Sequence, residues 1–170
     1  KGKFREPQIE IIAGSEDTVT THIENNCKYR FDVRKVMFAK GNVSERIRIA
    51  KQVKKNEVIV DMFAWIGYFT IPISKLAKPK KIYSIELNPI SFNFLKENLK
   101  INNINNVEAI HGDCIEVIDN LIKKGIRADR IIMGYLPPPK DYLSETFKII
   151  KKKGVLHYEE LIFVDKEKEE

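Results

Sequence analysis

Cysteine is scarce in this chain of 170 residues, and long apolar runs are absent. The only cysteines are Cys27 and Cys114, and their separation matches no metal-binding spacing. We therefore predict two free thiols, no metal site and a reducing, cytoplasmic location. No stretch approaches the roughly 18 consecutive apolar residues that cross a bilayer. Residues 1–7 lack the apolar core of a signal peptide. These absences predict neither a membrane partner nor a disulfide framework.

Acidic residues are outnumbered by basic ones. The chain carries 30 Lys and Arg against 24 Asp and Glu, a net charge of +6, and its first 55 residues are rich in Lys and Arg. A basic protein attracts polyanions such as RNA, but a lysine-rich solvated surface produces the same balance. Both interpretations remain open on charge alone.

The first part of the chain has the short apolar runs of β-strands. These runs lie at 9–12, 19–23 and 28–33. Asn25 and Asn26 separate the last two and predict a hairpin turn, because asparagine tolerates positive φ. Residues 44–50 then predict a helix with Ser44 as its N-cap.

From Val58 onward, strand-like and helix-like segments alternate. Strands are predicted at 58–63, 81–86, 107–111, 130–133 and 155–158, and helices at 68–77, 89–101, 115–124 and 142–152. Such alternation builds a parallel sheet with helices on both faces. The predicted fold class is therefore α/β, in a chain of about one domain.

Polar residues follow the strands at the end where doubly wound sheets bind ligands. Asp61, Glu86, Asp113 with Cys114, and Gly134 come at or after the first four predicted strands. A carboxylate in the place of Glu86 can accept hydrogen bonds from two ribose hydroxyls, and Asp113 with the Cys114 backbone could meet an adenine amino group. Helix caps and solvated turns are the competing interpretation of each single residue. The ordered set favours an adenosine ligand.

Glycine is also sparse where a phosphate-binding loop would lie. The loop after the first strand has one glycine, Gly67, and no basic or glycine-rich phosphate cradle. A nicotinamide-cofactor domain needs G-x-G-x-x-G there. Carboxylates at three strand ends suit a ligand with a sulfonium cation and no phosphate, which favours S-adenosyl-L-methionine as the cofactor.

The segment Asp61–Pro72, with Lys40–Arg46 before it, resembles one archaeal and eukaryotic family. That family contains the tRNA guanine-37 N1-methyltransferase and the wybutosine-pathway aminocarboxypropyl transferase. The resemblance covers roughly residues 25–160 and implies a class I methyltransferase (Rossmann-like) fold, with tRNA as partner. Together with the change of pattern along the chain, it predicts a β-rich segment at 1–43 packed on an S-adenosylmethionine-binding catalytic domain at 44–170. We expect this domain to be C-terminally incomplete, because the fold usually adds two further strands.

The resemblance also implies residue roles. Arg46 would contact the amino acid part of the cofactor, Glu86 the ribose, and Asp113 with Cys114 the adenine. Phe63 and Gly67 would shape the loop, and Ala39 would make any contact through its backbone. Glu45 is a candidate proton acceptor. Without the resemblance, an exposed Glu45–Arg46 helix pair would be the simpler interpretation.

Three features indicate the aminocarboxypropyl branch. Gly134-Tyr135 and Met37 stand where the methyltransferases have Asn-Leu and Tyr, and Gly67-Tyr68 follows the first strand. This branch implies transfer of the 3-amino-3-carboxypropyl group to 4-demethylwyosine at position 37 of tRNA(Phe). Tyr68, Tyr135 and Pro137 would face the substrate, although Tyr68 and Tyr135 could equally pack against helices.

Two alternatives remain at this point. The first is tRNA guanine-37 N1-methylation. The second is a catalytically inactive RNA-binding module, because Trp65 replaces a family glycine where the backbone normally approaches the ligand. An indole at this position could obstruct or reshape the site.

Overall fold

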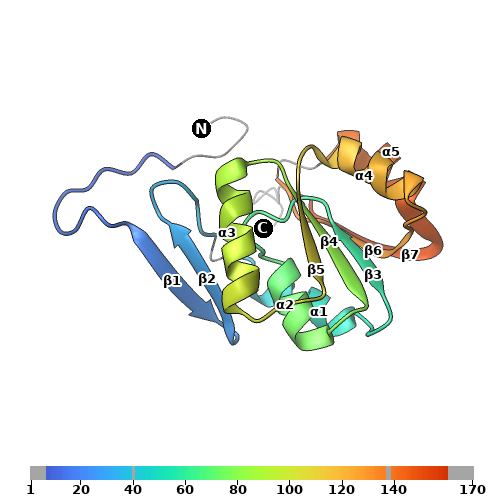
Figure 1. Cartoon of the computed structure of the whole chain (residues 1–170), viewed down its shortest axis with the longest axis horizontal. Helices are drawn as coiled ribbons and strands as arrows, with labels where there is room; N and C mark the ends of the chain where they lie inside the picture. The colour runs from blue at the N-terminus through green and yellow to red at the C-terminus, as the bar shows by residue number, and fades with distance from the viewer. Residues whose placement is uncertain (1–6, 40, 137–138, 161–170) are drawn as a thin grey trace, which may run out of the picture.

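A parallel five-stranded sheet forms the centre of the molecule, and an antiparallel hairpin lies beside it (Figure 1). The computed structural model describes residues 7–39, 41–136 and 139–160. The order of the strands in the sheet is β5-β4-β3-β6-β7. The strands are β3 (Val58–Asp61), β4 (Lys81–Glu86), β5 (Val107–His111), β6 (Ala128–Met133) and β7 (Ile150–Tyr158). The predicted α/β class is confirmed.

Helices cover both faces of the sheet. They are α1 (Val43–Gln52), α2 (Thr70–Ala77), α3 (Pro89–Ile101), α4 (Cys114–Lys123) and α5 (Leu143–Ile149), with a 3₁₀ turn, η1 (Lys140–Tyr142), before α5. Neighbouring residues of β3 point to opposite faces: Ile59 packs with α1 and α2, whereas Val60 packs with α4 and α5. Burial on both faces explains why this strand is a continuous apolar run in the sequence.

The hairpin consists of β1 (Val19–Glu24) and β2 (Cys27–Asp32). Asn25 and Asn26 connect the strands with φ values of 49° and 60°, so the predicted turn is confirmed. The outer edge of β2 is covered by α3, because the Asn98 side chain accepts from Arg30 N at 2.6 Å and the Asn102 side chain accepts from Lys28 N at 2.9 Å. The same two amides donate back to β2 carbonyls. These bonds anchor the hairpin beside the sheet.

Three sequence predictions are wrong. Residues 9–12 form no strand; Ile12 is almost fully exposed, so the run has no surface on which to pack. Helix α1 begins at Val43 after Asn42, and no side chain caps it, so Ser44 is not the N-cap. Residues 150–152, predicted as the end of a helix, belong to β7, since Ile150 already pairs with Ala128 of β6. Tertiary pairing there outweighs local helix propensity.

None of the helices within the described ranges is both long enough and apolar enough to cross a membrane.

Candidate active site

A cavity of about 350 Å³ lies at the carboxyl ends of the strands. The sequence-predicted residues that line it are Ala39, Arg46, Phe63, Tyr68, Glu86, Asp113, Cys114, Gly134 and Tyr135. Segments far apart in the chain therefore converge there, as the strand-end rule predicts. Asp61, Gly67 and Glu45 do not line this cavity, and Pro137 lies outside the described residues.

Glu86, at the end of β4, is a nearly buried carboxylate that backbone donors hold in place. Its Oε2 accepts from Trp65 N and its Oε1 from Asn88 N, each at 2.7 Å. Burial raises the pKa of Glu86, and these backbone hydrogen bonds act in the opposite direction. A third backbone donor, Leu87, also binds this carboxylate, and a carboxylate has about four acceptor sites, so Glu86 can still accept a hydrogen bond from a ligand in the cavity.

The loop between β3 and α2 has an unusual backbone. Trp65 adopts a φ of 51° and Gly67 a φ of 102°. A Cβ at Gly67 would lie 2.6 Å from Ile71 Cδ1, so a larger residue would collide with α2. A left-handed conformation costs a non-glycine residue about 1–2 kcal/mol. The Trp65 indole nevertheless has a defined position, because Nε1 donates to the Met37 carbonyl at 3.1 Å.

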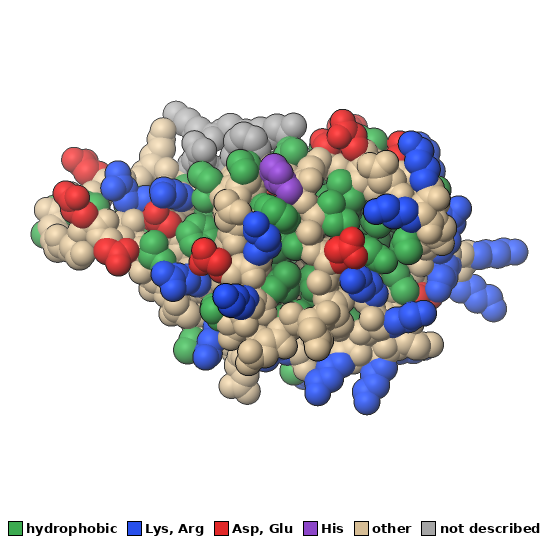
Figure 2. All heavy atoms as spheres, viewed as in Figure 1, with side chains coloured by type: hydrophobic (Ala, Val, Ile, Leu, Met, Phe, Trp, Pro, Cys, Tyr) green, Lys and Arg blue, Asp and Glu red, His purple; other side chains and the backbone are tan. Residues whose placement is uncertain are grey.

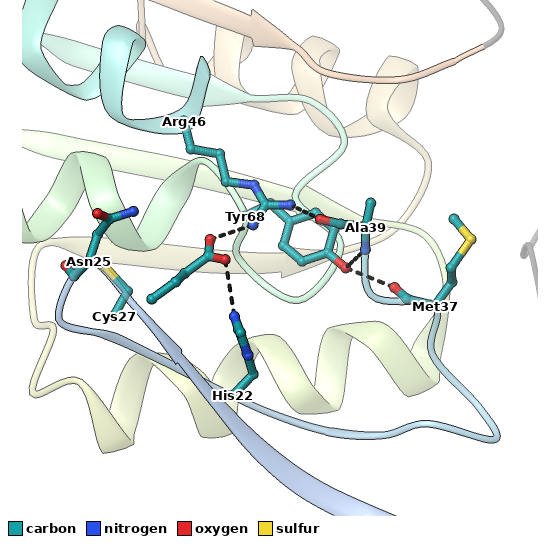
Figure 3. Close-up of polar contacts among 8 residues, drawn as sticks. His22, Asn25, Cys27, Met37, Ala39, Arg46 and Tyr68 are labelled. Atoms are coloured by element: carbon teal, nitrogen blue, oxygen red, sulfur yellow. Dashed lines mark hydrogen bonds and ion pairs between the residues drawn. The ribbon is translucent and has the colours of Figure 1, made fainter. Parts of the chain in front are cut away.

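Arg46, on α1, is buried rather than exposed, and Figure 3 shows it beside Ala39 and Tyr68. Its Nη1 lies 2.5 Å from Glu24 Oε1, its Nη2 donates to the Ala39 carbonyl at 2.6 Å, and its guanidinium lies over the Tyr68 ring at 4.1 Å. Its Nε is buried and has no hydrogen-bond partner among the described residues. The alternative of an exposed Glu45–Arg46 pair is therefore wrong. Arg46 instead lines the cavity.

Tyr68 uses its hydroxyl within the protein. The hydroxyl accepts from Ala39 N at 3.1 Å and donates to the Met37 carbonyl at 2.8 Å, while burial raises its pKa to about 12. Its ring packs edge-on against Phe38. Tyr68 and Trp65 therefore both bind the Met37 carbonyl, and together they fix the segment before α1 as one wall of the cavity.

A second aromatic group forms another wall of the cavity. The Phe63 ring lies 5.0 Å from the Tyr135 ring and 5.2 Å from the Tyr142 ring. Gly134 precedes Tyr135, and a Cβ there would lie 2.3 Å from the Phe69 ring. The cavity therefore has aromatic walls and no side chain at position 134.

Asp113 and Cys114 begin α4 at the end of β5. Asp113 caps the helix by accepting from Ile115 N at 2.9 Å, so the cap interpretation holds for a residue that also lines the cavity. Burial raises the pKa of Cys114 to about 12, which keeps its thiol protonated at neutral pH. Cys114 therefore offers the cavity a neutral thiol and its backbone.

Asp61 supports the site from behind. It is 1% exposed, and its Oδ2 accepts from the Thr70 hydroxyl at 2.7 Å. Burial raises its pKa to about 7. Asp61 fixes the start of α2 to β3 and does not reach the cavity.

Glu45 lines a different, smaller cavity of about 180 Å³. Arg48 binds both of its carboxylate oxygens at 2.6 Å and lowers its pKa. The smaller cavity also contains Arg48, His157 and Glu159. Gly134 and Glu159 line both cavities, so the two meet at these residues.

The protein family whose model is described as the TRM5/TYW2 methyltransferase domain matches residues 20–169. This chain belongs to that family. The resemblance predicted from the strand-end motifs is thereby confirmed.

Two relatives and one solved structure of the TRM5/TYW2 family show how far the similarity extends. The tRNA(Phe) (4-demethylwyosine(37)-C(7)) aminocarboxypropyltransferase of Methanocaldococcus jannaschii is 45% identical, over 95% of this chain and 62% of that protein. The tRNA (guanine(37)-N(1))-methyltransferase Trm5b of Pyrococcus abyssi is 35% identical, over 93% of this chain and 45% of that protein. The crystal structure of M. jannaschii TYW2 in complex with AdoMet has a TM-score of 0.79 at 43% identity, covering 88% of this chain and 65% of that one. The TRM5/TYW2 chain described here thus spans less than two thirds of these relatives.

Sequence reasoning missed several residues that line the larger cavity of this TRM5/TYW2 chain. Asn88, Tyr142 and Glu159 line it, and Glu24 binds Arg46 behind it. Glu159 follows the fifth strand directly, so the strand-end rule applied to that strand would have found it. Glu24 has no comparable signal, because it lies 22 residues before Arg46 on a different element.

Proposed function

We propose that this chain is the catalytic domain of an enzyme that transfers the 3-amino-3-carboxypropyl group of S-adenosyl-L-methionine to 4-demethylwyosine at position 37 of tRNA(Phe). The observation that carries the proposal is a cavity with aromatic walls and a fixed carboxylate at the strand ends, in a chain 45% identical to a relative named for this reaction. When bound, the cofactor supplies a sulfonium that activates its three attached carbons.

The residues that line the cavity fit this ligand. Glu86 would accept hydrogen bonds from the ribose hydroxyls, and Asp113 with the Cys114 backbone would meet the adenine. Arg46 and the Ala39 backbone line the cavity and suit the amino acid part. Arg46 is the only Lys or Arg among the described residues that line the cavity, so a bound phosphate would find no cluster of cations.

Orientation decides which carbon of the sulfonium reacts. We propose that the loop residues Phe63 and Gly67 and the walls formed by Tyr68 and Tyr135 place the amino acid side chain, rather than the methyl group, toward the base. The side chain at position 134 is a single hydrogen atom, so no amide lies there to bind a guanine. Pro137 remains a proposed substrate-facing residue by its place after β6.

The partner in this proposal is tRNA. Figure 2 shows Lys and Arg side chains gathered along the lower and right-hand edges of one face, and Lys151, Lys152 and Lys153 of β7 are exposed. Neutralising RNA phosphates releases counterions, so tRNA affinity should fall steeply between low and physiological salt. The two unpaired cysteines suit a reducing compartment, and we propose a cytoplasmic location. The division into a β-rich segment at 1–43 and a catalytic domain at 44–170 belongs to the same proposal.

Mass analysis of the modified nucleoside tests the reaction. We expect purified protein, incubated with the cofactor and tRNA(Phe) that carries 4-demethylwyosine, to produce the aminocarboxypropyl derivative. A methylated guanosine from unmodified tRNA would instead support the N1-methyltransferase, to which the chain is 35% identical in one relative. Absence of both products and of cofactor binding would support the inactive RNA-binding module.

A further inference from the structure

Glu159 stands where the two cavities meet. It follows β7 directly, and its backbone amide donates to the Met133 carbonyl at 3.4 Å, which holds it beside the end of β6. Both cavities are lined by Glu159 and by Gly134, the residue after Met133. Among the described residues, Glu159 is the titratable side chain common to both cavities, so a cofactor in the larger cavity and a base in the smaller one would both lie beside it.

The two carboxylates of the smaller cavity differ in their surroundings. Arg48 donates two hydrogen bonds to Glu45 and so stabilises its ionised form. Glu159 has no such support: its Oε1 is buried and has no hydrogen-bond partner among the described residues. Burial and the nearby charge of Glu45 raise the pKa of Glu159, while Arg46 acts in the opposite direction. Two carboxyl groups with pKa values moved apart in this way suit different roles, and Glu159 is the stronger base.

Transfer to an aromatic carbon requires such a base. In the proposed reaction, C7 of 4-demethylwyosine uses a ring electron pair to form a bond with the γ-carbon of the methionine part. The γ-carbon–sulfur bond breaks, and its electron pair goes to sulfur, which leaves as neutral methylthioadenosine. The base is then a cation with both hydrogen and the new substituent on C7. Aromaticity returns when the C7–H electron pair goes back to the ring and the proton leaves.

We propose that the Glu159 carboxylate accepts this proton, an assignment that rests on the proposed aminocarboxypropyl transfer. The carboxylate becomes a carboxylic acid and afterwards releases the proton to solvent, so that the complete reaction produces one proton for each group transferred. Glu45 stays ionised beside Arg48 and does not take part in this step.

Three variants test the assignment: Glu159→Gln, Glu45→Gln and, as a matched control on the adjacent exposed residue, Glu160→Gln. We expect E159Q to lower kcat about 100-fold, the middle of the range for a lost general base. The dissociation constant for S-adenosylmethionine, measured by calorimetry, should stay within about twofold of the wild-type value. E160Q should keep kcat within about twofold on the same scale. Thermal melting establishes that each variant is folded.

Substrate deuterated at C7 provides a readout that a merely structural role would not change. We expect a larger isotope effect on kcat in E159Q than in the wild type, because proton removal then limits the rate. Carbon-13 NMR of the labelled Glu159 carboxyl, in the protein without cofactor, should show a pKa above the ordinary value for glutamate.

Several outcomes would overturn the assignment. They are unchanged kcat in folded E159Q, a 100-fold loss in E45Q with little loss in E159Q, and loss of cofactor binding in E159Q. A Glu159 pKa at or below the ordinary value would also contradict it. Failure of the proposed function has a different signature, since the wild-type protein itself would then release no methylthioadenosine.

Discussion

Two buried arginines, Arg130 on β6 and Arg46 on α1, show how similar side chains serve different roles. Arg130 on β6 binds Glu57 twice, at 2.8 and 3.1 Å, and also contacts His157 Nε2 and the Gln52 carbonyl. Arg46, beside the cavity, is equally buried but leaves its Nε without a partner among the described residues. A completed network contributes to the integrity of the fold, whereas the incomplete one lies beside the cavity, where we propose that Arg46 binds the cofactor.

We expect the largest effect from removing Arg130, on the stability of the fold. Arg130→Met would leave the Glu57 carboxylate buried without its partner, which costs about 3–5 kcal/mol of unfolding free energy. Urea denaturation would measure this loss, and Arg48→Met, which removes an exposed arginine, is the matched control with little expected change. Folded R130M should bind S-adenosylmethionine with unchanged affinity. Weaker cofactor binding in the folded variant would contradict the separation of the two roles.

Glu86 should have the next largest effect, on binding rather than on the fold. Glu86→Ala removes a carboxylate that would accept from two ribose hydroxyls, so we expect S-adenosylmethionine to bind about 1–3 kcal/mol more weakly. Calorimetry measures the change, and Glu108→Ala on the exposed side of β5 is the control. An unchanged dissociation constant in folded E86A would remove Glu86 from the site.

Arg46→Lys tests the proposed role of the arginine beside the cavity in cofactor binding. Lysine keeps the positive charge near Glu24 but lacks the planar fork that reaches Ala39 and presents Nε. We expect roughly tenfold weaker cofactor binding, about 1.4 kcal/mol. Arg130→Lys, the same exchange in the completed network, should instead lower stability and leave affinity unchanged. Equal effects of the two exchanges on affinity would show that the arginines do not differ in role.

His157 provides a pH-dependent version of the same comparison. Burial, together with the charges of Arg130 and Arg48, lowers its pKa from 6.5 to about 4, while Glu45 and Glu57 act in the opposite direction. Between these values the unfolded chain binds the extra proton, so the contribution of His157 is fully present above pH 6.5 and is lost as the pH falls toward 4.

The variant His157→Gln should therefore show a weaker loss of stability on acidification than the wild type. The expected difference is about 1 kcal/mol once partial exposure is allowed for. Since burial raises the pKa of Asp61 to about 7, which favours the folded state as the pH falls, only the difference between the two proteins reports His157. If the urea midpoint changed between pH 7 and pH 5 by the same amount in the variant and in the wild type, this account would be contradicted.

The sequence predicts features that depend on neighbouring residues better than features that depend on contacts between distant residues. Local patterns gave the hairpin at Asn25-Asn26, the exact bounds of β4, and the strand ends that carry Glu86 and Asp113. They failed where pairing at long range decides, as at Ile150, which joins β6 instead of extending a helix.

Two contacts could not be predicted from spacing in the sequence, because they join distant segments of the chain. They are the Arg46–Glu24 pair and the hydrogen bond from the Trp65 indole to the Met37 carbonyl. The Trp65 ring was expected to obstruct or reshape the site. In the structure it lines the cavity, and its backbone amide holds Glu86.

We propose above all that the 3-amino-3-carboxypropyl group of the cofactor, and not its methyl group, is transferred to the base. Two preparations of S-adenosylmethionine, radiolabelled separately on the methyl and on the carboxyl carbon, decide this with tRNA(Phe) that carries 4-demethylwyosine. We predict that the carboxyl label enters the tRNA while the methyl label leaves in methylthioadenosine. Methyl label in the tRNA, with S-adenosylhomocysteine as the by-product, would contradict the account.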